Sequence, residues 1–162
     1  MKKIILSLVV LLIAGNVFSQ TRPTSKVKKA FFEKYENAEI VRWESETERN
    51  RVTLWKAFFK DDGVLRSVWF DSKANWIQTK TKINEDELPE AVLKSIDDNY
   101  YQYKIVITAR FENPETEGYE VFLDNGQDGF NVQFSKEGDV LNRTIRSKGY
   151  KPIDDEGKEI ED

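Results

Sequence analysis

The sequence predicts an α+β domain made of two tandem α-β-β-β-β repeats, with the helices packed on one face of an antiparallel sheet. Three observations lead to this prediction. One apolar pattern occurs twice along the chain, at an offset of about 65 residues. In each copy, a stretch with helical periodicity precedes runs in which apolar and polar residues alternate. Short turns join the runs, and short turns favour antiparallel neighbours.

The repeat consists of large apolar residues at matching positions, and it assigns residues 25–83 to the first copy and 84–147 to the second. The matched pairs are Val27 with Val92, Phe31 with Ile96, Tyr35 with Tyr100, Ile40 with Ile105, Trp55 with Tyr119, Ala57 with Val121, Phe59 with Leu123, Val68 with Val132, Phe70 with Phe134 and Trp76 with Val140. So many matches at nearly one offset indicate a duplicated unit.

Residues 1–19 have the composition of a signal peptide. Lys2 and Lys3 precede an apolar run, residues 4–14, that only Ser7 interrupts, and a cleavage site follows at Ser19. A membrane anchor would need about 20 apolar residues to cross the hydrocarbon core, so we expect no membrane span after cleavage. No cysteine follows the run that could carry a lipid. The predicted localisation is therefore periplasmic or secreted.

Each repeat is predicted to open with a helix. In the first, Val27, Phe31 and Tyr35 recur at helical spacing and place apolar groups on one face. In the second, residues 84–89 supply acidic side chains and a proline for a first turn. The apolar stripe that follows consists of Ala91, Val92, Ser95, Ile96 and Tyr100.

Alternating runs predict four strands after each helix, separated by turn-forming residues. The predicted strands of the first repeat are residues 40–47, 52–60, 64–70 and 76–83, and those of the second are 105–111, 119–123, 130–134 and 140–146. Residues 148–162 are rich in Asp and Glu and poor in large apolar residues. We expect them to form an acidic tail outside the packed domain of residues 20–147.

Composition excludes several classes of function. The chain contains no His and no Cys, which rules out Ser-His-Asp triads, cysteine nucleophiles and ordinary zinc sites. Its net charge of −4 with interspersed signs argues against nucleic acid as a partner, because phosphate binding needs clustered Lys and Arg. We expect no cofactor and no enzymatic activity.

Two carboxylate patterns still need an interpretation. Glu44, Glu46 and Glu48 alternate along one strand face, where they could act as an acid and base pair or simply face solvent; we favour the solvated face because no apolar pocket is evident. Residues 124–129 resemble the start of a calcium loop, but the third position is Gly126 and the twelfth is Ser135. We favour a hairpin turn there, and also a turn at 71–75.

The candidate binding residues are apolar side chains on the sheet face opposite the helices. If Trp55, Ala57 and Phe59 face the helix, alternation sends the residues between them to the other side. An exposed apolar patch on an open sheet marks a contact site, or a surface that a tail, the other repeat or a second copy covers. The residues assigned to this patch are Leu54, Phe58 and Trp69, with Phe122 as a weaker extension.

These features resemble the PepSY-like family of exported proteins, which are also described as beta-lactamase-inhibitor-like. The resemblance rests on the signal peptide, a helix ending in Tyr35, the strand at 39–44, the segment 68–76 and the Leu88-Pro89 pair. It covers about residues 25–146 and implies a BLIP-like two-layer fold with no established catalytic residues. The chain departs from the family pattern at Ala74, where most members carry Gly in the strand-joining turn.

The function expected from the sequence is that of a non-enzymatic, exported binding or structural module. Its partner is a protein or another envelope component, and it is engaged through the open sheet face; self-association stays open. Two alternatives remain. One is an inhibitor of a periplasmic or secreted hydrolase that acts by occlusion, and the other is a carboxylate-based glycan hydrolase.

Overall fold

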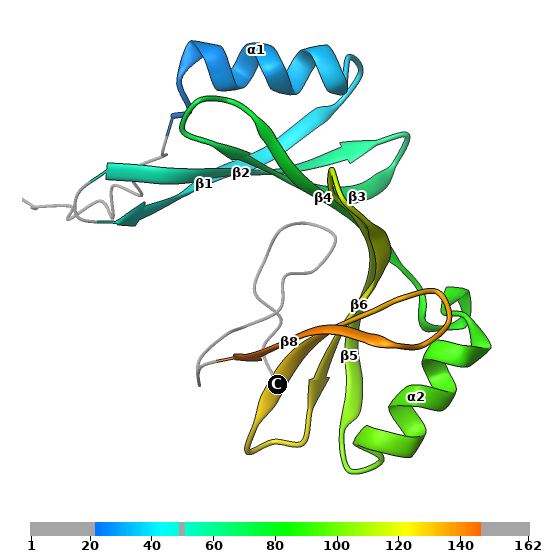
Figure 1. The fold of residues 1–162 in the computed structure, drawn as a ribbon. Coiled ribbons are helices and arrows are strands. Elements are labelled where there is room, and N and C mark those ends of the chain that lie inside the picture. The colour runs from blue at the N-terminus through cyan, green and yellow to red at the C-terminus, as the bar shows by residue number, and fades with distance from the viewer. Residues whose placement is uncertain (1–21, 49–50, 147–162) are drawn as a thin grey trace, which may run out of the picture.

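The computed structural model describes residues 22–48 and 51–146 (Figure 1). Within these ranges it contains two α-helices, one 3₁₀ helix and eight β-strands. Their bounds are α1 Ser25–Lys34, β1 Glu39–Glu48, β2 Arg51–Asp61, β3 Val64–Asp71, β4 Trp76–Ile83, η1 Glu85–Glu87, α2 Glu90–Tyr100, β5 Lys104–Glu112, β6 Glu117–Asp124, β7 Gly129–Phe134 and β8 Val140–Arg146. The predicted signal peptide and acidic tail lie outside the described residues.

The eight strands form one sheet in chain order, and each strand pairs antiparallel with the next. The predicted α+β class is therefore confirmed, and each predicted strand lies within an observed one. The pairing of β4 with β5 joins the two halves, although η1 and α2 lie between these strands in the chain. Figure 1 shows the sheet curving away from both helices.

Helix α1 begins where the Thr24 side chain accepts a hydrogen bond from the backbone N–H of Val27 at 3.3 Å, as an N-cap residue does. Its buried residues Val27 and Phe31, with Tyr35 just beyond its end, pack on strands β2 and β3. The phenol of Tyr35 also contacts the Thr79 hydroxyl at 2.5 Å, which ties the helix end to β4. This apolar stripe is the one that the helical spacing predicts.

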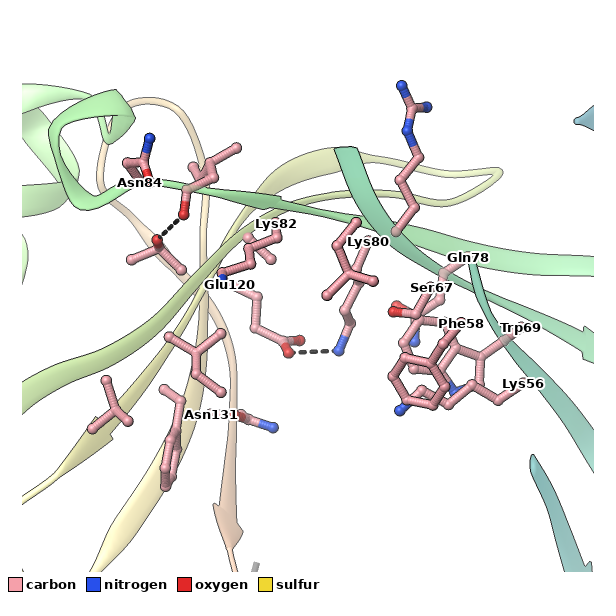
Figure 2. A pocket seen from close by; sticks show the side chains of 18 of the residues that line it. Lys56, Phe58, Ser67, Trp69, Gln78, Lys80, Lys82, Asn84, Glu120 and Asn131 are labelled. Atoms are coloured by element: carbon pink, nitrogen blue, oxygen red, sulfur yellow. Dashed lines mark hydrogen bonds and ion pairs between the residues drawn. The ribbon is translucent and has the colours of Figure 1, made fainter. Parts of the chain in front are cut away.

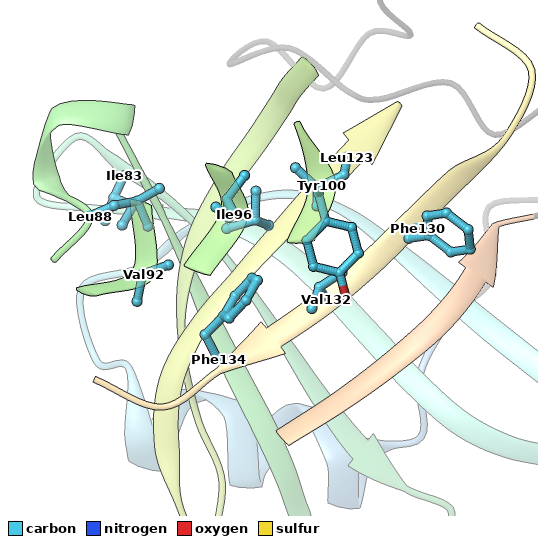
Figure 3. Close-up of a cluster of buried hydrophobic side chains, with 10 residues drawn as sticks. Ile83, Leu88, Val92, Ile96, Tyr100, Leu123, Phe130, Val132 and Phe134 are labelled. Carbon is cyan, nitrogen blue, oxygen red and sulfur yellow. The ribbon is translucent and has the colours of Figure 1, made fainter. Parts of the chain in front are cut away.

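Helix α2 differs from the prediction at its start. The acidic residues before Pro89 do not form its first turn; they form the separate 3₁₀ helix η1, and α2 begins at Glu90. The backbone N–H of Asn84, the residue before η1, donates to the carboxylate of Glu87 at 2.7 Å, and this hydrogen bond caps the start of η1. The buried face of α2 then packs on β6 and β7, as Figure 3 shows for Val92, Ile96 and Tyr100.

Both helices cover the same face of the sheet, as the pairing register shows. Residues that pair directly across an antiparallel sheet share one face, and one such row runs from Arg66 through Thr81, Arg110 and Tyr119 to Phe134. This row links the strands under α1 to the core under α2. The opposite face, called here the open face, carries neither helix.

Two predicted turns are confirmed as hairpin turns. Between β6 and β7, the Asn125 side chain accepts from the backbone N–H groups of Gln127 and Asp128 at 2.9 and 2.8 Å. Between β3 and β4, Asp71 accepts from the backbone of Lys73 and from both the backbone and the side chain of Asn75, at 2.7 to 2.8 Å. Burial opposes the charged form of Asp71, but these hydrogen bonds outweigh it and lower the pKa of the carboxyl.

Candidate functional site

The open face contains a hollow of about 580 Å³, which strands from both halves of the sheet line (Figure 2). The lining residues that matter below are Lys56, Phe58, Ser67, Trp69, Gln78, Lys80, Lys82, Glu120, Phe122 and Asn131. They come from β2, β3, β4, β6 and β7. The hollow therefore depends on the pairing of the two halves, and we treat it as the candidate site.

Three of the four predicted contact residues line this hollow. Phe58 and Trp69 lie on the open face because Phe58 pairs with Ser67 and Trp69 with Lys56, away from the α1 core. Phe122 lies on the same face, paired with Asn131. Leu54 shares the face but lies near the start of β2, opposite Glu46 and Asp71, and does not line the hollow.

The expectation that these rings form an exposed patch is wrong. Phe58, Trp69 and Phe122 are only 6%, 9% and 5% exposed. Basic side chains account for part of this burial at Phe58 and Trp69, and Phe122 lies close to the backbone of Gly129, where a Cβ would approach its ring within 2.8 Å. Alternation predicts the face of a side chain, but it carries no information about what lies over that side chain.

Cations lie over the faces of both first-half rings. The guanidinium of Arg42 and the ammonium of Lys56 lie 4.4 and 4.0 Å from the centroid of Phe58. The ammonium groups of Lys56 and Lys80 lie 4.8 and 4.9 Å from that of Trp69. These distances are within the range of cation–π attraction. Each ring thus has two basic groups within this range of its centroid, and Lys56 contributes to both.

An ion pair crosses the centre of the hollow and joins the two halves. Lys80 on β4 contacts Glu120 on β6 at 2.5 Å, and the second Glu120 oxygen accepts from Gln133 at 3.0 Å. The pair spans the intervening strand β5, where the small residue Ala109 lies beside Glu120 in the register. Sequence analysis did not identify Lys80, Lys56 or Glu120 as site residues, because no local pattern connects strands that pair only in the tertiary structure.

The carboxylates considered for catalysis lie in an ordinary surface setting. Glu44 pairs with Arg42 at 2.9 Å, and Glu46 is exposed opposite Leu54, where it is one of the residues that line the hollow. The side chain of Glu48 lies outside the described ones. Among the described residues, no group of three or more carboxylates gathers in a geometry that could hold a metal ion. The Asp71 and Asn125 turns use their side-chain oxygens on their own backbone.

Among the residues that the structure describes, the one ionisable group with a strongly shifted pKa lies away from the hollow. Burial raises the pKa of Tyr35 to about 12, partly offset by its contact with Thr79. Tyr35 belongs to the core between α1 and the sheet. A shifted pKa marks a functional site only when the group also lies in a cleft, so we interpret Tyr35 as a packing residue. None of the helices in the described part of the chain is long and apolar enough to span a membrane.

Solved structures with the same fold come from Bacteroides species. A BLIP-like protein of Bacteroides fragilis is 27% identical, with a TM-score of 0.63 over 80% of this chain and 91% of that chain. A DUF2874 family protein of Bacteroides uniformis is 20% identical, with a TM-score of 0.65 over 80% and 94%. A Bacteroides eggerthii protein described as "putative periplasmic" is 21% identical, with a TM-score of 0.62 over 77% and 90%.

A comparison with curated proteins gives no match. The family model described as "Putative beta-lactamase-inhibitor-like, PepSY-like" matches residues 53–142. This range runs from β2 into β8 and contains both rings of the first half, the Lys80–Glu120 pair and all of α2. Because the match covers more than half of the chain, the protein belongs to the PepSY-like family.

Proposed function

We propose that this protein is a non-enzymatic binding module that engages a protein partner through the hollow of the open face. The observation that carries the proposal is the set of cation-flanked rings, Phe58 and Trp69, in a hollow that both halves of the sheet build. Aromatic residues are enriched at protein interfaces, and Trp is among the residue types that supply most of the binding energy there. The two helix-and-strand units, which we regard as repeats, form this surface together.

The proposed localisation is outside the cytoplasm, in the periplasm or secreted. Two features support it: the signal-peptide composition of residues 1–19, and the description of a same-fold protein as periplasmic. A cysteine-free chain of this size does not depend on disulfides, so its core can form in either redox environment.

A second candidate is an inhibitor that occludes the active site of a periplasmic or secreted hydrolase. The description of the family as beta-lactamase-inhibitor-like and the BLIP-like fold of the Bacteroides fragilis protein favour it. It uses the same hollow and differs only in the class of partner. The two candidates are distinguished by the activity of a beta-lactamase, measured with a chromogenic lactam in the presence of an excess of this protein. Loss of turnover supports the inhibitor, and unchanged turnover supports the general binding module.

The test compares two charge-matched variants in capture from envelope extract, with quantitative mass spectrometry as the readout. Lys82→Glu changes an exposed residue of the hollow, whereas Lys26→Glu makes the same change on an exposed residue of α1. We expect Lys82→Glu to remove specific proteins that the wild type and Lys26→Glu both retain. Equal capture by all three proteins would place the binding surface elsewhere.

Catalysis is tested separately, because the absence of an activity needs its own measurement. Incubation with fluorogenic glycans should give no turnover above buffer. Turnover that is lost in a Glu120→Gln variant would support the glycan hydrolase in place of the binding module, since Glu120 is the buried carboxylate of the hollow.

A further inference from the structure

Within the described part of the chain, the sheet ends in two strands that each have one unpaired edge. The strand order runs from β1 to β8, so β1 pairs with β2 alone and β8 with β7 alone (Figure 1). An unpaired edge presents backbone N–H and C=O groups to which another strand can pair. Apolar side chains are exposed on both edge strands, and these are Ile40, Val41, Val140, Leu141 and Ile145.

The pairing registers of the two halves, which we regard as repeats, correspond strand by strand. Strand β8 corresponds to β4, because Val140 pairs with Phe134 beside the same kind of register shift that occurs where Trp76 pairs with Phe70. The offset between these two strands is 64 residues. Strand β1 corresponds to β5 at an offset of 65, and both have a register shift near their start. The β4–β5 pairing is therefore equivalent to a pairing of β8 with the β1 strand of another copy.

The β4–β5 pairing also supplies a register for a junction between copies. Lys80 on β4 pairs with Phe111 on β5, and the pairing is antiparallel. Moved to the edge strands by the two offsets, this register gives two pairs of facing residues, Thr144 with Glu46 and Ile145 with Ser45. Thr144, Ile145 and Glu46 are exposed and Ser45 is half-buried, so a second strand can reach these positions.

The charges of the two edge strands are opposite. Strand β1 contains four Glu and one Arg, whereas β8 contains two Arg and no acidic residue. Opposite charges on facing strands stabilise a strand pairing, and like charges directly opposite each other destabilise it. The pairing of β8 with β1 is therefore favoured over the pairing of two β1 strands or two β8 strands.

A junction between copies should be weaker than the junction inside the chain. The ion pair of Lys80 with Glu120 crosses the β4–β5 junction. The corresponding residues of a junction between copies are Thr144 and Lys56, which cannot form an ion pair. We therefore expect an association that is reversible and depends on protein concentration.

We propose that copies of this chain associate head to tail, with β8 of one copy pairing antiparallel with β1 of the next. The sheet then continues across the junction. The contact joins two different surfaces, so each pair of copies keeps a free β1 and a free β8 that can add further copies. The association does not rest on the proposed function, because it uses the backbone groups of the sheet edges.

Disulfide trapping tests the register, because the chain contains no cysteine and each variant then has a single one. Facing residues of an antiparallel pair have Cβ atoms about 4.5 to 5.5 Å apart, which is close to the separation in a disulfide. Two single-cysteine variants, one of them isotopically labelled, are mixed in a glutathione redox buffer. Intact mass spectrometry then identifies which two variants each disulfide joins.

The facing combinations should link, and these are Thr144→Cys with Glu46→Cys and Ile145→Cys with Ser45→Cys. The crossed combinations, Thr144→Cys with Ser45→Cys and Ile145→Cys with Glu46→Cys, should link severalfold less, because their side chains point to opposite faces of the sheet. Equal yields in facing and crossed combinations would overturn the proposal. An excess of disulfides between two copies of one variant would also overturn it, since the contact would then join identical surfaces.

Sedimentation over a range of protein concentrations is the second readout. The mean mass of the wild type should rise with concentration. Thr144→Glu places a carboxylate opposite Glu46 and should weaken self-association severalfold, whereas Thr116→Glu in the exposed β5–β6 turn should not. The double variant Thr144→Glu with Glu46→Lys should restore self-association, because the facing charges are again opposite. A mean mass that stays at that of the monomer, or that both Thr→Glu variants lower equally, would contradict the proposal.

These outcomes are separable from those of the proposed function. If the facing cysteines do not link while Lys82→Glu still loses its captured proteins, the binding module stands and the head-to-tail association is rejected. If the facing cysteines link and no captured protein distinguishes Lys82→Glu from Lys26→Glu, the sheet edges pair and the proposed partner surface in the hollow is rejected.

Discussion

Single residues in the core differ in what they contribute to stability, and their environments show why. Phe70 and Phe134 are almost fully buried in separate clusters, one under each helix. Tyr35 combines burial with a polar contact to Thr79, which also accepts from the indole N–H of Trp76 at 3.0 Å. Glu46 is exposed on the other side of the sheet. These positions allow two predictions at the residue scale.

Removing either buried phenyl ring should be costly. We expect Phe70→Ala and Phe134→Ala each to lower the free energy of unfolding by about 3 to 5 kcal/mol, because each truncation leaves a cavity. Glu46→Ala should change it by less than about 0.5 kcal/mol, as at an ordinary surface site. Urea denaturation followed by circular dichroism measures all three. Similar losses at the three positions would contradict the assignment of the two sheet faces.

Tyr35 should make the fold sensitive to alkaline pH. Its pKa is about 12 in the folded protein and near 10 in an unfolded chain, so the unfolded state loses its proton first as the pH rises. Stability should therefore decrease from pH 10 upward, by up to about 2.7 kcal/mol once pH 12 is passed. The Tyr35→Phe variant should be less stable at neutral pH, and its free energy of unfolding should change less with pH above pH 10. Parallel pH curves for the two proteins would rule this out.

At the scale of the elements, the turns between strands carry the most specific constraints. The β3–β4 turn places Ala74 at φ +71°, and the corresponding β7–β8 turn places Gly138 at φ +88°. Only glycine adopts this left-handed region without steric cost. A Cβ at Gly138 would also come within 2.4 Å of the Ala91 carbonyl oxygen at the start of α2. Ala74 and Gly138 lie 64 residues apart, at the offset of the proposed repeat, but the sequence does not reveal this contact.

Exchanging the residues at these two turns should have opposite effects. Ala74→Gly should raise the free energy of unfolding by up to about 1 kcal/mol, since it removes left-handed strain at a small entropic cost. Gly138→Ala should lower the free energy of unfolding by at least about 2 kcal/mol. The added Cβ would be strained by the left-handed backbone and would also clash with the Ala91 carbonyl oxygen, which belongs to backbone that cannot move easily. Thermal melts of both variants check the prediction, and shifts of the same sign would contradict it.

At the scale of the whole molecule, the pairing of β4 with β5 joins the two halves, together with the Lys80–Glu120 ion pair and a longer contact of 4.0 Å between Lys34 on α1 and Glu112 on β5. Lys80 and Glu120 are 18% and 11% exposed, whereas Lys94 and Asp98 on α2 have the same 2.5 Å separation at 71% and 55%. The same geometry thus occurs once in a nearly buried setting and once in solvent. Burial decides which pair matters, because a desolvated charge without its partner is costly.

A double-mutant cycle on each pair tests this difference. The Lys80→Ala and Glu120→Ala cycle should give a coupling energy of about 1 to 3 kcal/mol, and Glu120→Ala alone should weaken the contact between the halves. The corresponding cycle on Lys94 and Asp98 should give no measurable coupling, because water screens that pair. Equal coupling energies in the two cycles would contradict the prediction that burial strengthens the Lys80–Glu120 pair.

The sequence by itself determined the class of the domain, the strands, the apolar helix faces and the sheet face of each candidate residue. These features follow from local periodicity, because side chains alternate along a strand and recur along a helix turn. The 3₁₀ turn before α2 was missed because acidic residues followed by proline fit either kind of helix start. Leu54 was predicted on the correct face but lies outside the hollow, since alternation does not say how far along the sheet a residue lies.

Only the tertiary structure decided what covers the predicted rings and how the two halves meet. Lys56 reaches Phe58 on its own strand and Trp69 on the next. Lys80 on β4 reaches Trp69 on the neighbouring strand β3 and, across β5, Glu120 on β6. Contacts of this kind depend on register, curvature and rotamer, which residues distant in the chain set together. The rings therefore have a face that alternation predicts and an environment that only the paired strands create.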